Sequence, residues 1–288
     1  MADFDQLWDY SRPEQTEQAF RHLLPAAEQG SDRSYHAELL TQIARCLGLQ
    51  GRFAEGHALL DQVEGMLEAG LTPVPRLRYL LERGRVFRSS GQPALAIPLF
   101  LEAWNLGRDT GEDDLATDAA HMLGITESEP ASQMEWNLRA LDLAERSPKA
   151  RRWCGSLYNN IGWAFADAGQ LQQALDMFQR AVQFRAEQGA PVPLRTAKWC
   201  VGKMLRLLHR TEEALALQQE LCKQVDPAAG EDGFILEEIA ECLLQLDRGA
   251  EAQPWFAQAY RYLSQERWLV QQEPDRIRRL HELGGLHS

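Results

Sequence analysis

YNNIGWAFADAGQLQQALDMFQRAV, residues 158–182, is the stretch of sequence that decides the predicted fold. Two runs of apolar and small residues are joined by a polar turn at Gly169. Its NNIGW segment places two amides and an indole beside a glycine, which is compatible with the lining of a chemical site. The same residues are equally compatible with one unit of a scaffold that carries out no chemistry.

Small or aliphatic residues equivalent to Ala181 recur along the chain at intervals of 37, 40, 37, 41, 40 and 38 residues. Nearly every segment has helical spacing, and no long alternating run of polar and apolar residues indicates a sheet. Regular self-similarity of this kind is typical of repeat architectures. The equivalent positions are Ala26, Val63, Ala103, Ala140, Ala181, Leu221 and Ala259.

Three units show the pattern most clearly, over residues 78–104, 158–182 and 236–260. In each, a small residue on a first helix is followed three places later by a bulky apolar one. After a turn come a small residue, then Phe, then Ala. Glycine or alanine lets two helices approach, and the aromatic ring fills the space beside the contact. The small residues are Gly84, Gly162 and Ala240, and the rings are Phe100, Phe178 and Phe256.

This pattern resembles the tetratricopeptide repeat (TPR), whose signature matches the chain over roughly residues 13–264. The matching positions are Tyr158, Ile161, Gly162, Phe165, Ala174, Phe178 and Ala181. The period is longer than the usual 34 residues, and Ser147-Pro148 predicts an early start for the helix that carries NNIGW. The resemblance implies an all-α fold, a right-handed superhelical α-solenoid of antiparallel helix pairs.

We expect one continuous domain with a capping helix region at 1–36, repeats at 37–264 and a capping helix at 265–288. Residues 13–28 predict a second helix whose partner is degenerate, and residues 275–283 predict a helix stopped by Gly284-Gly285. Three units lack the expected Phe and have other residues at its position, namely Leu60, Trp136-Asn137 and Gln218.

Composition restricts the classes of function. A formal net charge of −12 disfavours nucleic acid and anionic membranes as partners. The amino-terminal residues have no signal-peptide pattern, and no apolar run is long enough to span a membrane. Five scattered cysteines without a CxxC motif indicate unpaired thiols in a cytoplasmic protein.

No pattern of catalytic residues is present, so we expect no enzyme activity, no cofactor and no metal. The sequence has no GxGxxG, GxxxxGK[ST], HExxH or GxSxG motif. Acidic pairs such as Glu212-Glu213 and Glu237-Glu238 lie at predicted helix starts, where they favour the helix dipole.

The TPR resemblance implies that first helices line a concave groove, which here is basic through its early and middle parts. Arginine and lysine attract carboxylates or phosphates, and tryptophan supplies flat apolar area. The last repeat presents Glu237, Glu238 and Glu241 at these positions. The predicted partner-binding residues are Arg45, Arg78, Arg85, Arg88, His121, Asn159, Asn160, Trp163, Trp199, Lys203 and Arg206.

The leading hypothesis is therefore a scaffold that binds an acidic or carboxylate-bearing segment of a protein or peptide partner. The alternative for the groove is that Arg85, Arg88 and Arg206 are solvated and that Trp163 and Trp199 pack on neighbouring helices. A ligand-gated regulator that senses a small peptide or metabolite is the alternative function. The carboxylate clamp that co-chaperone TPR domains use is absent.

Overall fold

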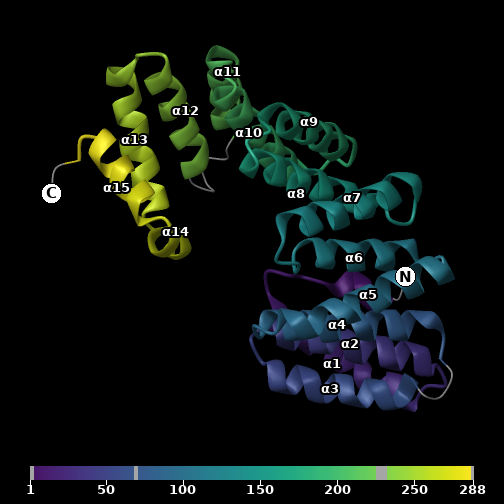
Figure 1. Ribbon diagram of the computed structural model, residues 1–288. Coiled ribbons are helices and arrows are strands. Elements are labelled where there is room, and N and C mark those ends of the chain that lie inside the picture. Colours follow the sequence, from purple (N-terminus) through teal and green to yellow (C-terminus); the bar gives the residue numbers. More distant parts are fainter. Residues whose placement is uncertain (1–2, 68–70, 225–231, 287–288) are drawn as a thin grey trace. The chain divides into compact units, whose positions relative to one another are not determined.

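The computed structural model describes residues 3–67, 71–224 and 232–286, and its regular structure in these ranges is entirely helical (Figure 1). The expected all-α fold is confirmed. The elements of the first half are η1 (Asp3–Leu7), α1 (Pro13–Gln29), α2 (Arg33–Leu49), α3 (Phe53–Leu67), α4 (Pro73–Ser89), α5 (Pro93–Thr110), α6 (Asp113–Gly124), α7 (Pro130–Arg146), η2 (Arg151–Trp153) and α8 (Cys154–Asp167). The rest are α9 (Leu171–Glu187), α10 (Pro191–Leu207), α11 (Thr211–Lys223), α12 (Gly233–Gln245), α13 (Gly249–Leu263), α14 (Arg267–Gln272) and α15 (Pro274–Leu283).

The chain forms two compact units, Met1–Leu157 and Tyr158–Ser288, and the boundary falls inside α8. The single continuous domain and its two caps therefore remain predictions. The helices expected over residues 13–28 and 275–283 correspond to α1 and α15. Val225, the last residue of one predicted repeat, and the chain ends 1–2 and 287–288 lie outside the described residues.

Within each unit, consecutive helices pack as neighbours and first helices also contact the next first helix. In the first unit α4 packs on α5 and also on α2 and α6. In the second unit α10 packs on α9 and α11 and also contacts α12. Each unit thus has a layer of first helices backed by second helices, which is the stacking that the repeat pattern predicts.

The predicted contact between a small residue and an aromatic ring holds the helix pairs together. A β-carbon added to Gly84 would lie 2.5 Å from a ring carbon of Phe100, and one added to Gly162 would lie 2.7 Å from Phe178. Both rings are completely buried. Glycine is therefore required where the ring of the second helix presses on the first helix.

Two of the units that lack this Phe place a buried amide in the same position. Gln218 is completely buried, and its Nε2 donates a hydrogen bond to the backbone oxygen of Trp199 at 3.1 Å. Asn137 lies over Gly124, and its Nδ2 donates to the backbone oxygen of Gln133 at 2.9 Å. The helix pair keeps its close approach because each buried amide has a backbone acceptor.

The predicted early start of the helix that carries NNIGW is wrong. Ser147 ends α7 instead, because its backbone nitrogen donates to the oxygen of Leu143 at 3.0 Å. A 3-10 turn, η2, follows, and α8 begins at Cys154. Within η2, Arg152 and Trp153 both donate to the carboxylate of Asp114 on α6, which fixes the turn away from a helical path.

Candidate functional site

No group of His, Cys, Asp and Glu side chains in the described part of the chain could hold a metal ion. None of the described helices is long and apolar enough to cross a membrane. The thiols of Cys46, Cys200 and Cys242 are buried, and burial raises the pKa of each to about 12. These thiols are therefore protonated and poorly reactive at neutral pH.

The predicted partner-binding residues all lie on first helices, and they form one set in each unit. Arg45 is on α2, Arg78, Arg85 and Arg88 are on α4, and His121 is on α6. The second unit carries the other set, with Asn159, Asn160 and Trp163 on α8 and Trp199, Lys203 and Arg206 on α10. The two sets are separate candidate surfaces.

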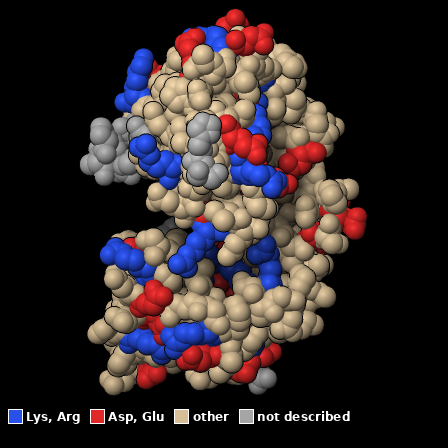
Figure 2. Space-filling model, turned by 90° about the vertical axis from the view of Figure 1, so that its left-hand side faces the viewer, with Lys and Arg blue, Asp and Glu red and all other residues tan. Residues whose placement is uncertain are grey.

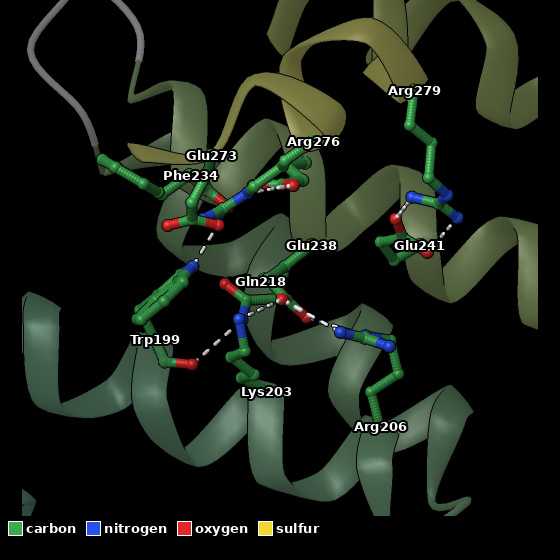
Figure 3. Close-up of polar contacts among 11 residues, drawn as sticks. Trp199, Lys203, Arg206, Gln218, Phe234, Glu238, Glu241, Glu273, Arg276 and Arg279 are labelled. Atoms are coloured by element: carbon green, nitrogen blue, oxygen red, sulfur yellow. Dashed lines mark hydrogen bonds and ion pairs between the residues drawn. The ribbon is translucent and has the colours of Figure 1, made fainter. Parts of the chain in front are cut away.

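In the second unit, a face of α10 meets a face of α12 (Figure 3). Trp199, Lys203 and Arg206 follow one another at intervals of four and three residues, so they share one side of α10. Phe234, Glu237, Glu238 and Glu241 have the same relation on α12. The two helices therefore bring a cationic face against an acidic one.

Glu238 is the centre of this contact. Its side chain is 3% exposed, and Arg206 binds both carboxylate oxygens, at 2.7 Å through Nε and 3.1 Å through Nη2. Lys203 Nζ lies farther away, 3.4 Å from Oε1. Burial opposes the charge of Arg206, but the hydrogen bonds and attraction of Glu238 outweigh it and raise its pKa. The bidentate pair is thus a structural joint between two repeats.

Helix α15 adds two further arginines to the same acidic face. Arg276 donates to Glu237 at 2.8 Å and pairs with Glu273 at 3.2 Å, and Arg279 pairs with Glu241. The cations and carboxylates of the cluster are equal in number, so their formal charges cancel. They are Lys203, Arg206, Arg276 and Arg279 on one side and Glu237, Glu238, Glu241 and Glu273 on the other.

A row of aromatic rings lies beside this ion-pair cluster. The ring centroids of Trp163 and Trp199 are 6.1 Å apart, those of Trp199 and Phe234 are 6.1 Å apart, and those of Phe234 and Trp268 are 6.4 Å apart. Lys203 Nζ lies over two of the rings, 5.2 Å from Trp199 and 6.0 Å from Trp163. Trp268 is 45% exposed, so the row reaches the surface of the second unit.

The indoles of the row are held in place by neighbouring helices, as the alternative for the groove expected. Trp163 meets Phe178 edge to face at 5.3 Å, and Trp199 Nε1 donates to the backbone oxygen of Phe234 at 3.1 Å. Both tryptophans nevertheless retain partial exposure. Packing and surface presentation therefore occur in the same residues.

In the first unit, carboxylates from adjacent elements bind most of the predicted arginines. Arg45 pairs with Glu82 at 3.1 Å, and Arg85 binds both Glu82 and Asp118. Arg78 pairs with Asp5 at 2.8 Å and with Glu38 at 3.1 Å. Arg88 donates to the backbone oxygen of Ile125 at 3.1 Å.

His121 lies beside this network. Its ring is 5.4 Å from that of Trp153. Burial and the nearby charges of Arg85 and Arg88 lower its pKa, and Asp118 opposes them only in part.

Neither surface presents an uncompensated row of positive charge. Arg85 and Arg206 are bound to carboxylates rather than solvated, with side chains 14% and 15% exposed. Acidic and basic side chains also adjoin one another over the face drawn in Figure 2. Charge alone therefore does not select the partner, and the assignment of these residues to partner binding remains a prediction.

Sequence reasoning missed the continuation of the aromatic row through Phe234 and Trp268. A signal was available, because the four rings follow one another at intervals of 36, 35 and 34 residues. The row moves one place earlier in each successive repeat interval, so an alignment in fixed phase hides it. Trp8 and Tyr10, which lie over Arg45, had no repeat signal at all.

Comparison with known proteins agrees with this fold. Residues 155–187 match the model of the tetratricopeptide repeat. The mouse (Mus musculus) outer dynein arm-docking complex subunit 4 is 24% identical over 133 residues, which are 46% of this chain and 20% of that protein. The chain thus spans about a fifth of the length of this curated relative.

Solved structures extend the similarity over nearly the whole chain. A signal-transduction ATPase with a tetratricopeptide repeat sensor from Pyrococcus horikoshii has a TM-score of 0.72 at 11% identity, covering 93% of this chain and 41% of that one. The apo form of the quorum sensor NprR from B. thuringiensis has a TM-score of 0.62 at 16% identity, covering 97% and 78%. NprR in complex with its cognate peptide NprX has a TM-score of 0.52 at 16% identity, covering 97% and 81%.

At these identities the similarity concerns the fold alone. Together with the repeat match, it confirms the resemblance: the chain is an array of TPR-like helix pairs, an α-solenoid fold.

Proposed function

We propose that the chain is a non-enzymatic scaffold that binds a protein or peptide partner on its first helices. The observation that carries this proposal is the aromatic row of the second unit, Trp163, Trp199, Phe234 and Trp268, with Lys203 beside it. Rings of this kind supply large, rigid contact area with a polar edge, which suits the recognition of a peptide segment. A cytoplasmic location, expected from the cysteines, is part of this proposal.

Lys203 is the residue of this surface that best fits a carboxylate-bearing partner. Its nearest carboxylate, that of Glu238, is already bound through both oxygens by Arg206. An ammonium group has three donors, and the Glu238 contact at 3.4 Å is too long to satisfy one fully. A partner carboxylate placed over the Trp199 ring would bind Lys203 without breaking the Arg206–Glu238 pair.

Support for a peptide partner also comes from the similar structures, one of which is NprR bound to its cognate peptide. The carboxylate clamp of co-chaperones is absent from this chain, so a different partner chemistry applies. The remaining predicted residues, from Arg45 to His121 on the first unit, are proposed as a second binding face.

The test is partner capture with variants of the aromatic row. Trp199→Ala combined with Lys203→Glu should abolish capture of specific partners from a native lysate, measured by quantitative mass spectrometry. Lys223→Glu is the matched control, because it makes the same charge change on the exposed side of α11. Equal loss in both variants, or no loss in the first, would reject the proposed surface.

The carboxylate requirement needs its own measurement. Segments of a captured partner would be synthesised with their Asp and Glu residues, and again with Asn and Gln at the same positions. Binding followed by tryptophan fluorescence should weaken at least tenfold for the amide versions. Equal affinity for both versions would remove the acidic partner from the proposal and leave the scaffold role.

A ligand-gated regulator is the second candidate function, and it is favoured because two of the similar structures are described as sensors. A gated array should change its dimensions when the peptide binds. Small-angle scattering with and without a captured peptide decides between the two, since a passive scaffold keeps its radius of gyration.

A further inference from the structure

The residues that precede α1 lie on the first-helix face of the first unit. This segment consists of η1 followed by Trp8, Asp9 and Tyr10, and it begins near the N label in Figure 1. Trp8 Nε1 donates to Gln42 Oε1 on α2 at 3.0 Å. Asp5 accepts from Arg78 Nη2 on α4 at 2.8 Å. The segment therefore passes across two successive first helices.

Two of the predicted partner-binding residues are bound by this segment. The guanidinium of Arg45 lies 5.7 Å from the ring centroid of Trp8 and 5.3 Å from that of Tyr10, and the two rings stack on each other at 4.6 Å. Arg78 lies 5.6 Å from the ring of Phe4, besides its pair with Asp5. Arginine planes thus contact aromatic faces and a carboxylate, which are strong modes of arginine recognition.

The segment has a buried anchor and an outer part. Phe4 is completely buried against Phe20 and Tyr35, at centroid distances of 6.1 and 5.3 Å, so it belongs to the core of the unit. Leu7 is 45% exposed and Tyr10 is 59% exposed, so the outer part lies on the surface. The outer part can leave the face while the anchor stays in place.

We propose that the α2–α4 face of the first unit binds peptide segments that combine acidic and aromatic residues, and that Asp5–Tyr10 occupies this face in cis. A partner segment of the same chemistry must displace it. The inference extends the proposed scaffold function to the first unit and rests on it. A tethered segment has an effective concentration on the order of millimolar, so the face is self-occupied unless the partner binds well.

A peptide of residues 3–12 of this chain, DFDQLWDYSR, is the probe. It would be labelled with a fluorophore and titrated by anisotropy into the wild-type chain and into the variant Asp5→Ala, Trp8→Ala, Tyr10→Ala. Phe4 is kept, so the core anchor is intact. The variant should bind the peptide at least tenfold more tightly than the wild type, because its own segment no longer competes.

Two further variants make the result specific to the face. Adding Arg78→Gln to the triple variant should weaken peptide binding at least tenfold. Adding Arg76→Gln, which removes an exposed arginine of α4 that pairs with Glu102, should leave it unchanged. An equal effect of the two would show non-specific charge attraction and overturn the proposal.

If the segment is only a structural cap, the triple variant loses helical content or binds the peptide no better than the wild type, and the proposal fails. Tyr10→Ala alone removes a mostly exposed ring and serves where the triple variant does not fold. It should bind the peptide at least threefold more tightly than the wild type, and an unchanged affinity overturns the proposal. Partner capture by the second unit is measured with Lys203→Glu, so the two proposals fail independently.

Discussion

Arg206 and Glu238 show how a single ion pair joins neighbouring repeats. The Glu238 side chain is almost completely buried, and Arg206 satisfies both of its oxygens. A buried carboxylate without its partner keeps the cost of desolvation and loses the attraction that offsets it. The pair therefore contributes more to the integrity of the array than an exposed pair of similar geometry.

We expect Arg206→Ala to lower the free energy of unfolding by about 3 kcal/mol, because Glu238 is left buried with only the distant Lys203. Urea denaturation monitored by circular dichroism measures the change. Adding Glu238→Ala should recover part of the loss. Arg210→Ala, which breaks an exposed pair with Glu213, is the control and should change the midpoint little. A similar loss in both variants would contradict this interpretation.

His121 makes stability depend on pH. Its pKa in the folded chain lies below the ordinary value of 6.5, so below that pH the unfolded chain binds a proton that the folded chain does not. Stability should fall as the pH is lowered from 7.5 to 5.5, by at most about 1.4 kcal/mol per pH unit for one proton. The variant His121→Gln should have a shallower dependence when urea denaturation is repeated at each pH. An unchanged slope would show that His121 is not the group responsible.

At the scale of elements, the turn between first and second helices has the same form in most repeats. Gly51, Gly91 and Gly169 have positive φ, and the residue after each donates its backbone N–H to an oxygen five residues back. This is the geometry of a Schellman-type helix end. The same turn occurs at His209 and Asp247, although neither is glycine.

Asp247→Gly should stabilise the chain by about 1 kcal/mol, because a residue with a β-carbon is strained at a φ of 58°. Thermal unfolding followed by circular dichroism measures the shift, which should be upward. Gly169→Ala, at a φ of 72° in the equivalent turn, is the reciprocal variant and should lower the melting temperature. A downward shift for Asp247→Gly would mean that its side chain makes a contact worth more than the strain.

At the scale of the whole molecule, the charge balance is opposed to binding polyanions. The formal net charge is −12, and the arginines of both candidate faces are bound to carboxylates or to backbone. Neutralising a nucleic-acid backbone requires clustered unpaired cations. The cations on these faces are already neutralised by the chain itself.

A fluorescent 20-nucleotide single strand should therefore bind with a Kd weaker than about 10⁻⁴ M at physiological salt, as judged by anisotropy. The triple variant of the segment before α1 is a useful companion, since it leaves Arg45 and Arg78 uncovered. It should remain a poor binder, because the carboxylates of Glu82 and Glu38 still pair with these arginines. Micromolar, steeply salt-dependent binding would contradict the expectation.

The periodicity of small and aromatic residues was sufficient to predict the helix pairs and their contacts. Gly84 with Phe100 and Gly162 with Phe178 lie within one repeat, so the spacing along one pair of helices determines them. The start of α8 was predicted wrongly, because Asp114, a residue of the preceding repeat, holds the η2 turn.

The sequence by itself therefore determined the helices, their pairing and the placement of the predicted site residues on first helices. Only the tertiary structure decided what those residues contact. Arg85 meets Asp118, Arg206 meets Glu238, and Arg78 meets Asp5 from a different part of the chain. The physical reason is that packing periodicity is local, whereas ion pairs depend on how each helix is rotated against its neighbour. The NNIGW segment is accordingly a helix contact at Gly162 and a proposed recognition surface at Trp163.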